Sequence, residues 1–270
     1  MKLLNIIYTF VITLSLFGCG GGGGGGGVPG IKNESAEGVW TGYAINAQGV
    51  SSDIVSLFYD GKYVTLNYVN KDDSSLTPND RKFYSGSYTI TGDNLSSPDT
   101  KSYLWDGLNT GSGIMNGTVY SKSTIKSIYE QSEAGTADLE KNSEIAIYET
   151  TLSEKNLNNN KLKGSWDVSD ADNKLLYDFD IDGSNVSAKA SDGCLIEGEI
   201  NIPKGNLNIF ELTFEISGSV CSFNGDYSGL GFLTTKLLPR DDESEVDKLV
   251  DVLTFAYSND AHGFVIEAIK

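Results

Sequence analysis

Much of the chain consists of short stretches in which apolar and polar residues alternate. The stretch Lys62–Val69 is one example, and Asp60-Gly61 separates it from the apolar stretch Ile54–Tyr59. Alternation places every second side chain on the same face of a β-strand. An Asp-Gly pair between two such stretches is a signal for a tight hairpin. The pattern therefore predicts antiparallel strands joined by turns.

The same criteria predict strands along both halves of the chain. In the first half they cover residues 39–45, 54–59, 62–69, 83–90, 114–120, 124–130 and 144–150. In the second half they cover residues 174–181, 185–190, 194–202, 207–217, 225–235, 251–258 and 262–269. One helix is predicted, over residues 244–250. The 14 tyrosines and 11 phenylalanines also suit half-buried strand surfaces, so the expected fold class is all-β.

The pattern begins again after a polar segment, residues 153–161. Gly164-Ser165-Trp166 repeats the spacing of Gly38-Val39-Trp40, and residues 198–207 parallel residues 86–95. A period of roughly 120 residues indicates a duplicated domain and not a solenoid. Seven or eight antiparallel strands in each copy would let each sheet close on itself. We therefore predict two tandem small antiparallel β-barrels or β-sandwiches, with one domain over residues 36–152 and the other over residues 162–270.

The Gly-x-Trp motif at the start of each copy resembles the signature of the lipocalins and of the wider calycin group. In that family the tryptophan closes one end of a barrel, beneath the first strand. The stretch Cys194–Leu233 also looks like small bacterial lipoproteins of unknown function with lipocalin-like β-domains. The resemblance implies two lipocalin-like barrels, although the other lipocalin motifs are absent. An ordinary core tryptophan beside a turn glycine remains the alternative.

Residues 1–18 have the pattern of an export signal peptide. A positive charge at Lys2 precedes the apolar stretch Leu3–Phe17. That stretch is shorter than the roughly 20 apolar residues of a membrane-spanning helix, and polar residues interrupt it. The tetrapeptide Leu16-Phe17-Gly18-Cys19 resembles the lipobox of bacterial lipoproteins, although Phe17 is bulkier than the residue usual there. The resemblance implies cleavage before Cys19 and acylation of its sulfur and amino groups, as with palmitate. An uncleaved anchor and simple secretion are the alternatives.

The residues after Cys19 predict where the protein is held and how. The next residue is Gly20 and not the aspartate that signals inner-membrane retention in that family, which implies the outer membrane of a Gram-negative bacterium. Gly20–Gly27 is a run of glycines, which have no side chains to bury and a high backbone entropy. Residues 19–35 are therefore expected to form a disordered tether. The sequence does not indicate whether the protein faces the periplasm or the outside of the cell.

The acidic composition limits the classes of partner. The chain has 37 Asp and Glu against 20 Lys and Arg, for a net charge of −17. Nucleic acids and anionic lipid headgroups both attract basic surfaces, so neither is an expected partner. The charge is expected to keep the protein soluble, and a basic protein partner is the alternative reading.

Apart from Cys19, the chain contains only Cys194 and Cys221. An even pair in an exported protein predicts a disulfide between them. Two cysteines and one distant histidine, His262, cannot complete a tetrahedral zinc site. No cofactor is predicted.

Three alternating aspartates are the weak candidates for a metal site. Asp178, Asp180 and Asp182, followed by a glycine, match the opening of an EF-hand calcium loop. The twelfth position of that loop needs a bidentate Glu, and here it is Lys189. The plainer expectation is a strand with its aspartates facing water, so no metal is predicted. The acidic run 241–245 is expected to be a solvated loop, with a contact for a basic partner or a weak divalent cation as the alternative.

No residue pattern indicates catalysis. A serine or cysteine nucleophile needs a positioned base, and His262 lies in an expected turn. We therefore predict that the protein is not an enzyme but a protein-binding or interaction module, with Tyr59, Tyr63 and Tyr68 as its exposed patch. A carrier of a small apolar ligand in a barrel cavity and a structural envelope protein are the alternatives. Side chains that fill the barrels would argue against the carrier.

Overall fold

The computed structural model describes residues 35–46, 51–68, 81–120, 124–130, 135–140, 156–168, 178–190, 193–238 and 248–270. All of them belong to one compact unit, residues 32–270. The signal peptide, Cys19, the glycine tether, the strand expected over residues 144–150 and the acidic run 241–245 lie outside the described residues. No described helix is long and apolar enough to cross a membrane.

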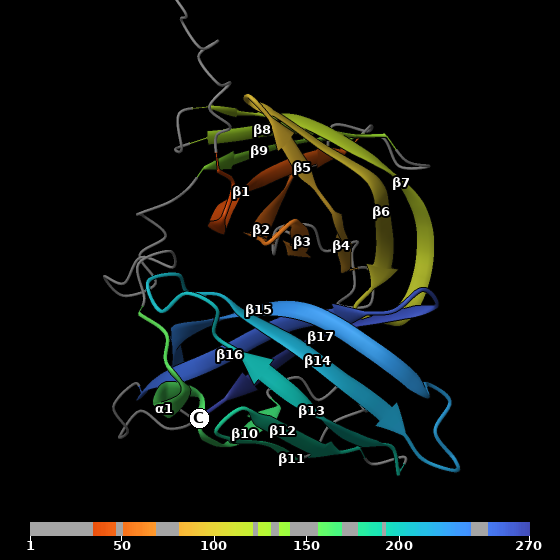
Figure 1. Ribbon diagram of the computed structural model, residues 1–270, viewed down its shortest axis with the longest axis vertical. Coiled ribbons are helices and arrows are strands. Elements are labelled where there is room, and N and C mark those ends of the chain that lie inside the picture. The colour runs from red at the N-terminus through yellow and green to blue at the C-terminus, as the bar shows by residue number, and fades with distance from the viewer. Residues whose placement is uncertain are drawn as a thin grey trace, which may run out of the picture. The chain divides into compact units, whose positions relative to one another are not determined.

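The first eight-stranded sheet closes into a ring, which we call ring one. Its strands are β1 (Gly38–Asn46), β2 (Ser51–Tyr59), β3 (Lys62–Tyr68), β4 (Lys82–Ser87), β6 (Asn94–Leu104), β7 (Asp106–Tyr120), β8 (Thr124–Glu130) and β9 (Gly135–Glu140). Each strand pairs antiparallel with the next, and β9 pairs back with β1. The short strand β5 (Thr89–Thr91) follows β4 and pairs with β6. Figure 1 draws ring one in colours from red to yellow-green.

The second sheet closes in the same way, and we call it ring two. It follows the single short helix of the described chain, α1 (Asn159–Leu162). Its strands are β10 (Gly164–Val168), β11 (Asp178–Asp182), β12 (Asn185–Lys189), β13 (Leu195–Asn201), β14 (Phe210–Ser217), β15 (Gly225–Leu238), β16 (Lys248–Ser258) and β17 (His262–Ile269). Successive strands pair antiparallel, and β17 pairs back with β10 (Figure 1). The prediction of an all-β protein built from two small antiparallel barrels is confirmed.

The repeated Gly-x-Trp motif has the same role in both rings. Trp40 in β1 donates a hydrogen bond from Nε1 to the carbonyl oxygen of Ala36, at 2.6 Å. Trp166 in β10 donates the equivalent bond to Leu162, at 2.7 Å. Both indoles are fully buried. Each therefore ties the segment before the first strand to its own barrel. Within the predicted linker, Leu157 is also buried in the core of ring two.

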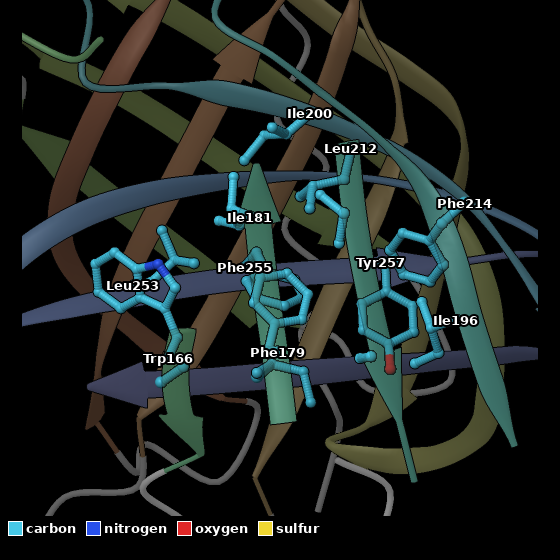
Figure 2. Close-up of a cluster of buried hydrophobic side chains, with 14 of the residues drawn as sticks. Trp166, Phe179, Ile181, Ile196, Ile200, Leu212, Phe214, Leu253, Phe255 and Tyr257 are labelled. Carbon is cyan, nitrogen blue, oxygen red and sulfur yellow. The ribbon is translucent and has the colours of Figure 1, made fainter. Parts of the chain in front are cut away.

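Closely packed apolar side chains fill the interior of ring two. Figure 2 shows Trp166, Phe179, Phe214, Phe255 and Tyr257 directed toward one another from different strands. The aromatic centroids of Phe214 and Tyr257 lie 4.6 Å apart, and those of Phe179 and Phe255 lie 5.0 Å apart. Such packing excludes water and contributes most of the stability of a barrel of this size.

The interior of ring one is apolar around Trp40 and polar elsewhere. The hydroxyls of Ser56 and Thr65 are hydrogen bonded at 2.8 Å, and Thr65 contacts the hydroxyl of Tyr129 at 3.3 Å. The hydroxyls of Tyr63 and Thr100 lie 2.5 Å apart. Side chains from four different strands are thus joined by buried hydrogen bonds.

An apolar contact joins the outer faces of the two rings. From ring one it includes Leu57, Leu66 and Phe83, and from ring two Leu230 and Val265, all buried. Over three residues, β7 also pairs antiparallel with β17. The rings therefore share a continuous core surface in addition to their separate interiors.

This contact changes the interpretation of three tyrosines. Tyr63 is not exposed but lies inside ring one, because the two-residue turn places it directly opposite the inward-facing Phe58. Tyr59 and Tyr68 are partly buried against the contact between the rings. The prediction that these three tyrosines form an exposed patch is wrong.

Other differences concern single elements. Strand β6 was not predicted, because Pro98 and its polar neighbours obscure the alternation. Pro98 lies at a register shift between Ser97 and Thr100, a bulge position where its missing N–H is tolerated. The predicted helix over residues 244–250 is wrong where it can be compared, since Lys248–Val250 begins β16 and pairs with β15. Strand β9 was also missed.

Candidate functional site

The predicted disulfide between Cys194 and Cys221 is formed, with a Cα–Cα distance of 5.0 Å. Cys194 lies immediately before β13, and Cys221 lies in the loop between β14 and β15. Both residues are buried. The bond therefore closes one end of the β13–β14 hairpin. In the same region, Val220 is the most exposed large apolar side chain of the described chain.

The candidate calcium aspartates lie on a strand, as the plainer reading expected. Asp180 and Asp182 are exposed, and the two apolar residues between the three aspartates are buried. Asp180 accepts a hydrogen bond from the hydroxyl of Ser165. Asp182 forms an ion pair with Lys163 at 2.9 Å, and this hydrogen bond lowers the pKa of the Asp182 carboxyl. The backbone of Asp178 pairs with Lys189. Among the described residues there is no group of three or more His, Cys, Asp or Glu side chains that could hold a metal.

His262 lies at the first position of β17 and not in the turn that was expected to contain it. Its ring packs edge-on against Phe223, with centroids 5.1 Å apart. Its backbone N–H donates to the side-chain oxygen of Asn259 at 2.8 Å.

A hollow of about 310 Å³ lies where the two rings meet. Ring one contributes residues of β3, β4 and β6 to its walls, and ring two contributes residues of β15, β16 and the turn after β16. We call it the inter-ring hollow. Two hydrogen bonds cross between the rings beside it. The hydroxyls of Ser85 and Ser258 are 3.0 Å apart, and Tyr103 donates to the carbonyl oxygen of Asn259 at 2.7 Å.

The charged side chains of the inter-ring hollow are held in pairs. Lys101 forms an ion pair with Asp260 across the two rings, and their hydrogen bond raises the pKa of Lys101 and lowers that of Asp260. Lys62 pairs with Glu211 at 3.1 Å, again across the rings. These exposed pairs contribute little to stability, but they fix where the charges lie.

Asp99 is held by the bulge in β6. Its carboxylate accepts hydrogen bonds from the backbone N–H and the hydroxyl of Ser87, both at 2.8 Å. A Cβ atom on Gly86 would lie 3.0 Å from a carboxylate oxygen of Asp99 and 3.1 Å from Tyr63. The glycine therefore leaves the space that this close approach needs.

A second, shallower hollow of about 890 Å³ shares Ser228, Ser258, Asn259 and Asp260 with the first. It extends over the outer face of β13–β15, where three acidic residues lie in register. Glu197 is directly opposite Glu215, and Glu215 is directly opposite Asp226. Three carboxylates in one row make this outer face negative, and like charges directly opposite each other in a sheet are destabilising.

Exposed apolar side chains gather on another face, formed by β1, β7 and β8 of ring one. Tyr43, Ile45, Ile114 and Ile128 are all exposed. Ile45 and Ile128 are both opposite Thr136 of the intervening strand β9, so two strand spacings, about 10 Å, separate them. Tyr43 lies two residues before Ile45 on β1. Ile114 lies two residues before Asn116, the β7 residue opposite Ile128, and is on the other side of the line from Ile45 to Ile128. We call these four residues the apolar row.

Sequence reasoning located the disulfide and the aspartates but missed both the inter-ring hollow and the apolar row. The hollow combines residues about 160 positions apart, such as Lys101 and Asp260, which no local pattern links. The Pro98-Asp99 pair was the one local signal, since proline within a strand indicates a bulge. Comparison with known proteins finds no matching family model, curated protein or solved structure.

Proposed function

We propose that this protein is an outer-membrane lipoprotein, held through acylated Cys19 and a glycine tether, whose two rings form a non-catalytic protein-binding module. The lipobox-like tetrapeptide supports the anchor. The Cys194–Cys221 disulfide supports an oxidising compartment, because such bonds persist outside the cytosol.

The apolar row is the observation that carries the protein-binding proposal. Its four side chains lie on the outer face of ring one and are exposed to solvent, and none of them belongs to the apolar contact with ring two. Exposed apolar side chains that gather on one face mark interaction sites more often than scattered ones do. The size of the row suits a weak or transient protein contact.

The interiors of the rings argue against the carrier alternative. Ring two is packed with aromatic and aliphatic side chains (Figure 2). Ring one combines an apolar cluster around Trp40 with buried hydrogen-bonded hydroxyls. A carrier of an apolar ligand needs an apolar cavity of several hundred Å³. The apolar row likewise favours recognition over a purely structural role.

Crosslinking in native membranes tests the proposal. A photocrosslinking residue at position 116, opposite Ile128 in the β7–β8 pairing, should capture a partner protein. Ile128→Ser should reduce that capture about tenfold, since burying the exposed half of an isoleucine contributes on the order of 1.5 kcal/mol. Leu249→Ser is the matched control, because Leu249 is also 53% exposed but lies on ring two. Equal capture by the two variants, or none by the parent protein, would contradict the proposal.

The anchor has a separate test. Cys19→Ser should leave the protein unacylated, so that metabolic labelling with palmitate is lost and the protein is released from the membrane or retains its signal peptide. Unchanged labelling and attachment would refute the lipoprotein assignment.

A further inference from the structure

We propose that the inter-ring hollow is a binding site for a short neutral saccharide. This inference is independent of the apolar row, which lies on a different face of ring one. It rests on the volume of the hollow, the balance of its charges and the mixture of groups that line it.

The volume fits a small ligand. At about 310 Å³, the hollow lies at the lower end of the range for ligand sites. It corresponds to roughly ten water molecules at about 30 Å³ each. One or two sugar rings would therefore displace most of its water.

The charges in the hollow favour a neutral ligand. Two cations, Lys62 and Lys101, face two carboxylates, Asp99 and Asp260, so the lining is balanced although the chain carries a net charge of −17. Each of these groups already has a partner: Lys101 has Asp260, Lys62 has Glu211, and Asp99 has Ser87. A charged ligand would have to compete with these interactions. A neutral hydroxyl can instead donate to a carboxylate or accept from an ammonium group that keeps its partner.

The uncharged lining is complementary to a polyol. The hydroxyls of Ser85, Ser258 and Ser228 can each both donate and accept hydrogen bonds, and Ser85 and Ser258 already use one of these with each other. Val64 and Leu230 also line the hollow, but both are buried in the apolar contact between the rings and offer a ligand almost no surface.

The site is preorganised by the two barrels. Apart from Asn259 and Asp260, its lining residues lie on paired strands, and Asn259 is fixed by the hydrogen bond from Tyr103. Its walls come from both rings, and the apolar contact holds these against each other. Little conformational entropy would be lost on binding, so a small polar ligand could bind with measurable affinity.

Saturation-transfer NMR on the full chain tests this inference. The probes are glucose, galactose, N-acetylglucosamine and maltose, with glucose 6-phosphate and hexalysine as an anionic and a cationic comparison. We expect at least one neutral sugar to bind with a millimolar or lower dissociation constant. Ser228→Trp, which places an indole at the exposed rim of the hollow, should weaken binding at least tenfold.

Thr213→Trp is the matched control. Thr213 is exposed and directly opposite Ser228 in the β14–β15 pairing, but it lines only the larger hollow. It should leave sugar binding unchanged. Asp99→Asn should weaken sugar binding, because it removes a charged acceptor and preserves the shape of the side chain.

Three outcomes would overturn the inference. They are the absence of binding by all the neutral sugars, sugar binding that Ser228→Trp leaves unchanged, and binding of only the charged probes. If a neutral sugar does bind, comparison of maltose with maltohexaose distinguishes a free sugar from the end of a glycan chain. Stronger binding of the longer molecule indicates the glycan, and equal or weaker binding indicates the free sugar.

Discussion

Tyr257 has a buried hydroxyl that the fold does not satisfy. It lies on β16 inside ring two, it is 1% exposed, and its oxygen has no hydrogen-bond partner among the described residues. Its ring packs against Phe214, with centroids 4.6 Å apart (Figure 2). It also packs against Phe264, with centroids 5.4 Å apart. Burial raises the pKa of Tyr257 well above its ordinary value, so the hydroxyl stays protonated as a donor without an acceptor.

Tyr257→Phe should therefore stabilise the protein. A buried polar group without a partner costs about 1–3 kcal/mol, and phenylalanine preserves the aromatic packing while removing that cost. Tyr63→Phe is the matched comparison in ring one. The hydroxyl of Tyr63 lies 2.5 Å from that of Thr100, which also has Ser97 at 3.1 Å. Since Thr100 keeps a partner, Tyr63→Phe should destabilise the protein by about 1 kcal/mol.

Urea denaturation followed by tryptophan fluorescence measures both effects. The expected order of unfolding free energies is Tyr257→Phe above the parent protein and the parent above Tyr63→Phe. A loss of about 1 kcal/mol or more in Tyr257→Phe would refute the reasoning, because it would mean that a bound water or a rearranged neighbour satisfies this hydroxyl.

Three further predictions concern the disulfide, the contact between the rings and an ion pair. Replacing both Cys194 and Cys221 by alanine should lower the unfolding free energy by about 3.5 kcal/mol on the chain-entropy model for a sequence separation of 27, as measured in urea; a loss below 1 kcal/mol would contradict it. Gly263→Ala should destabilise the protein by about 1–3 kcal/mol in the same assay, because the added Cβ would lie 2.5 Å from an aromatic carbon of ring one; unchanged stability would show that the contact can relax. The Asp260 carboxyl, whose pKa the hydrogen bond from Lys101 lowers, should titrate below its ordinary value in NMR, and Lys101→Gln should return it to that value. The contribution of the Asp260 carboxyl to stability is present above about pH 4 and is lost as the pH falls through the lowered pKa. If this carboxyl titrates identically in the parent protein and in Lys101→Gln, the ion pair is contradicted.

Strands and turns were predictable where alternation and turn chemistry agree. The hairpin at Asp60-Gly61 is formed, and both residues have a positive φ, as a tight two-residue turn requires. The inward positions Phe179 and Ile181 also follow directly from alternation. Strand β6 could not be predicted in this way, since Pro98 interrupts the alternation of apolar and polar residues.

The groups that line the inter-ring hollow could not be predicted, because the outer faces of the rings determine them. Alternation separates the two faces of a strand, but it does not say which part of an outer face another barrel covers. Val64 and Leu66 read as ordinary strand residues, although they face outward into the contact between the rings. The cross-ring pair of Lys62 and Glu211 depends on the same packing.

The apolar contact between the rings also has consequences for the synthesis and the evolution of the chain. Ring one is complete at Glu140, but Leu57, Leu66 and Phe83 on its outer face are covered only when β15–β17 have been synthesised. During that interval the newly made first barrel exposes an apolar surface that favours aggregation. The second barrel must then be synthesised quickly, or a chaperone must cover this surface. If a gene lost the sequence of either barrel, the apolar surface of the remaining barrel would stay exposed to solvent. Selection against aggregation would therefore keep the two barrels together as a single inherited unit.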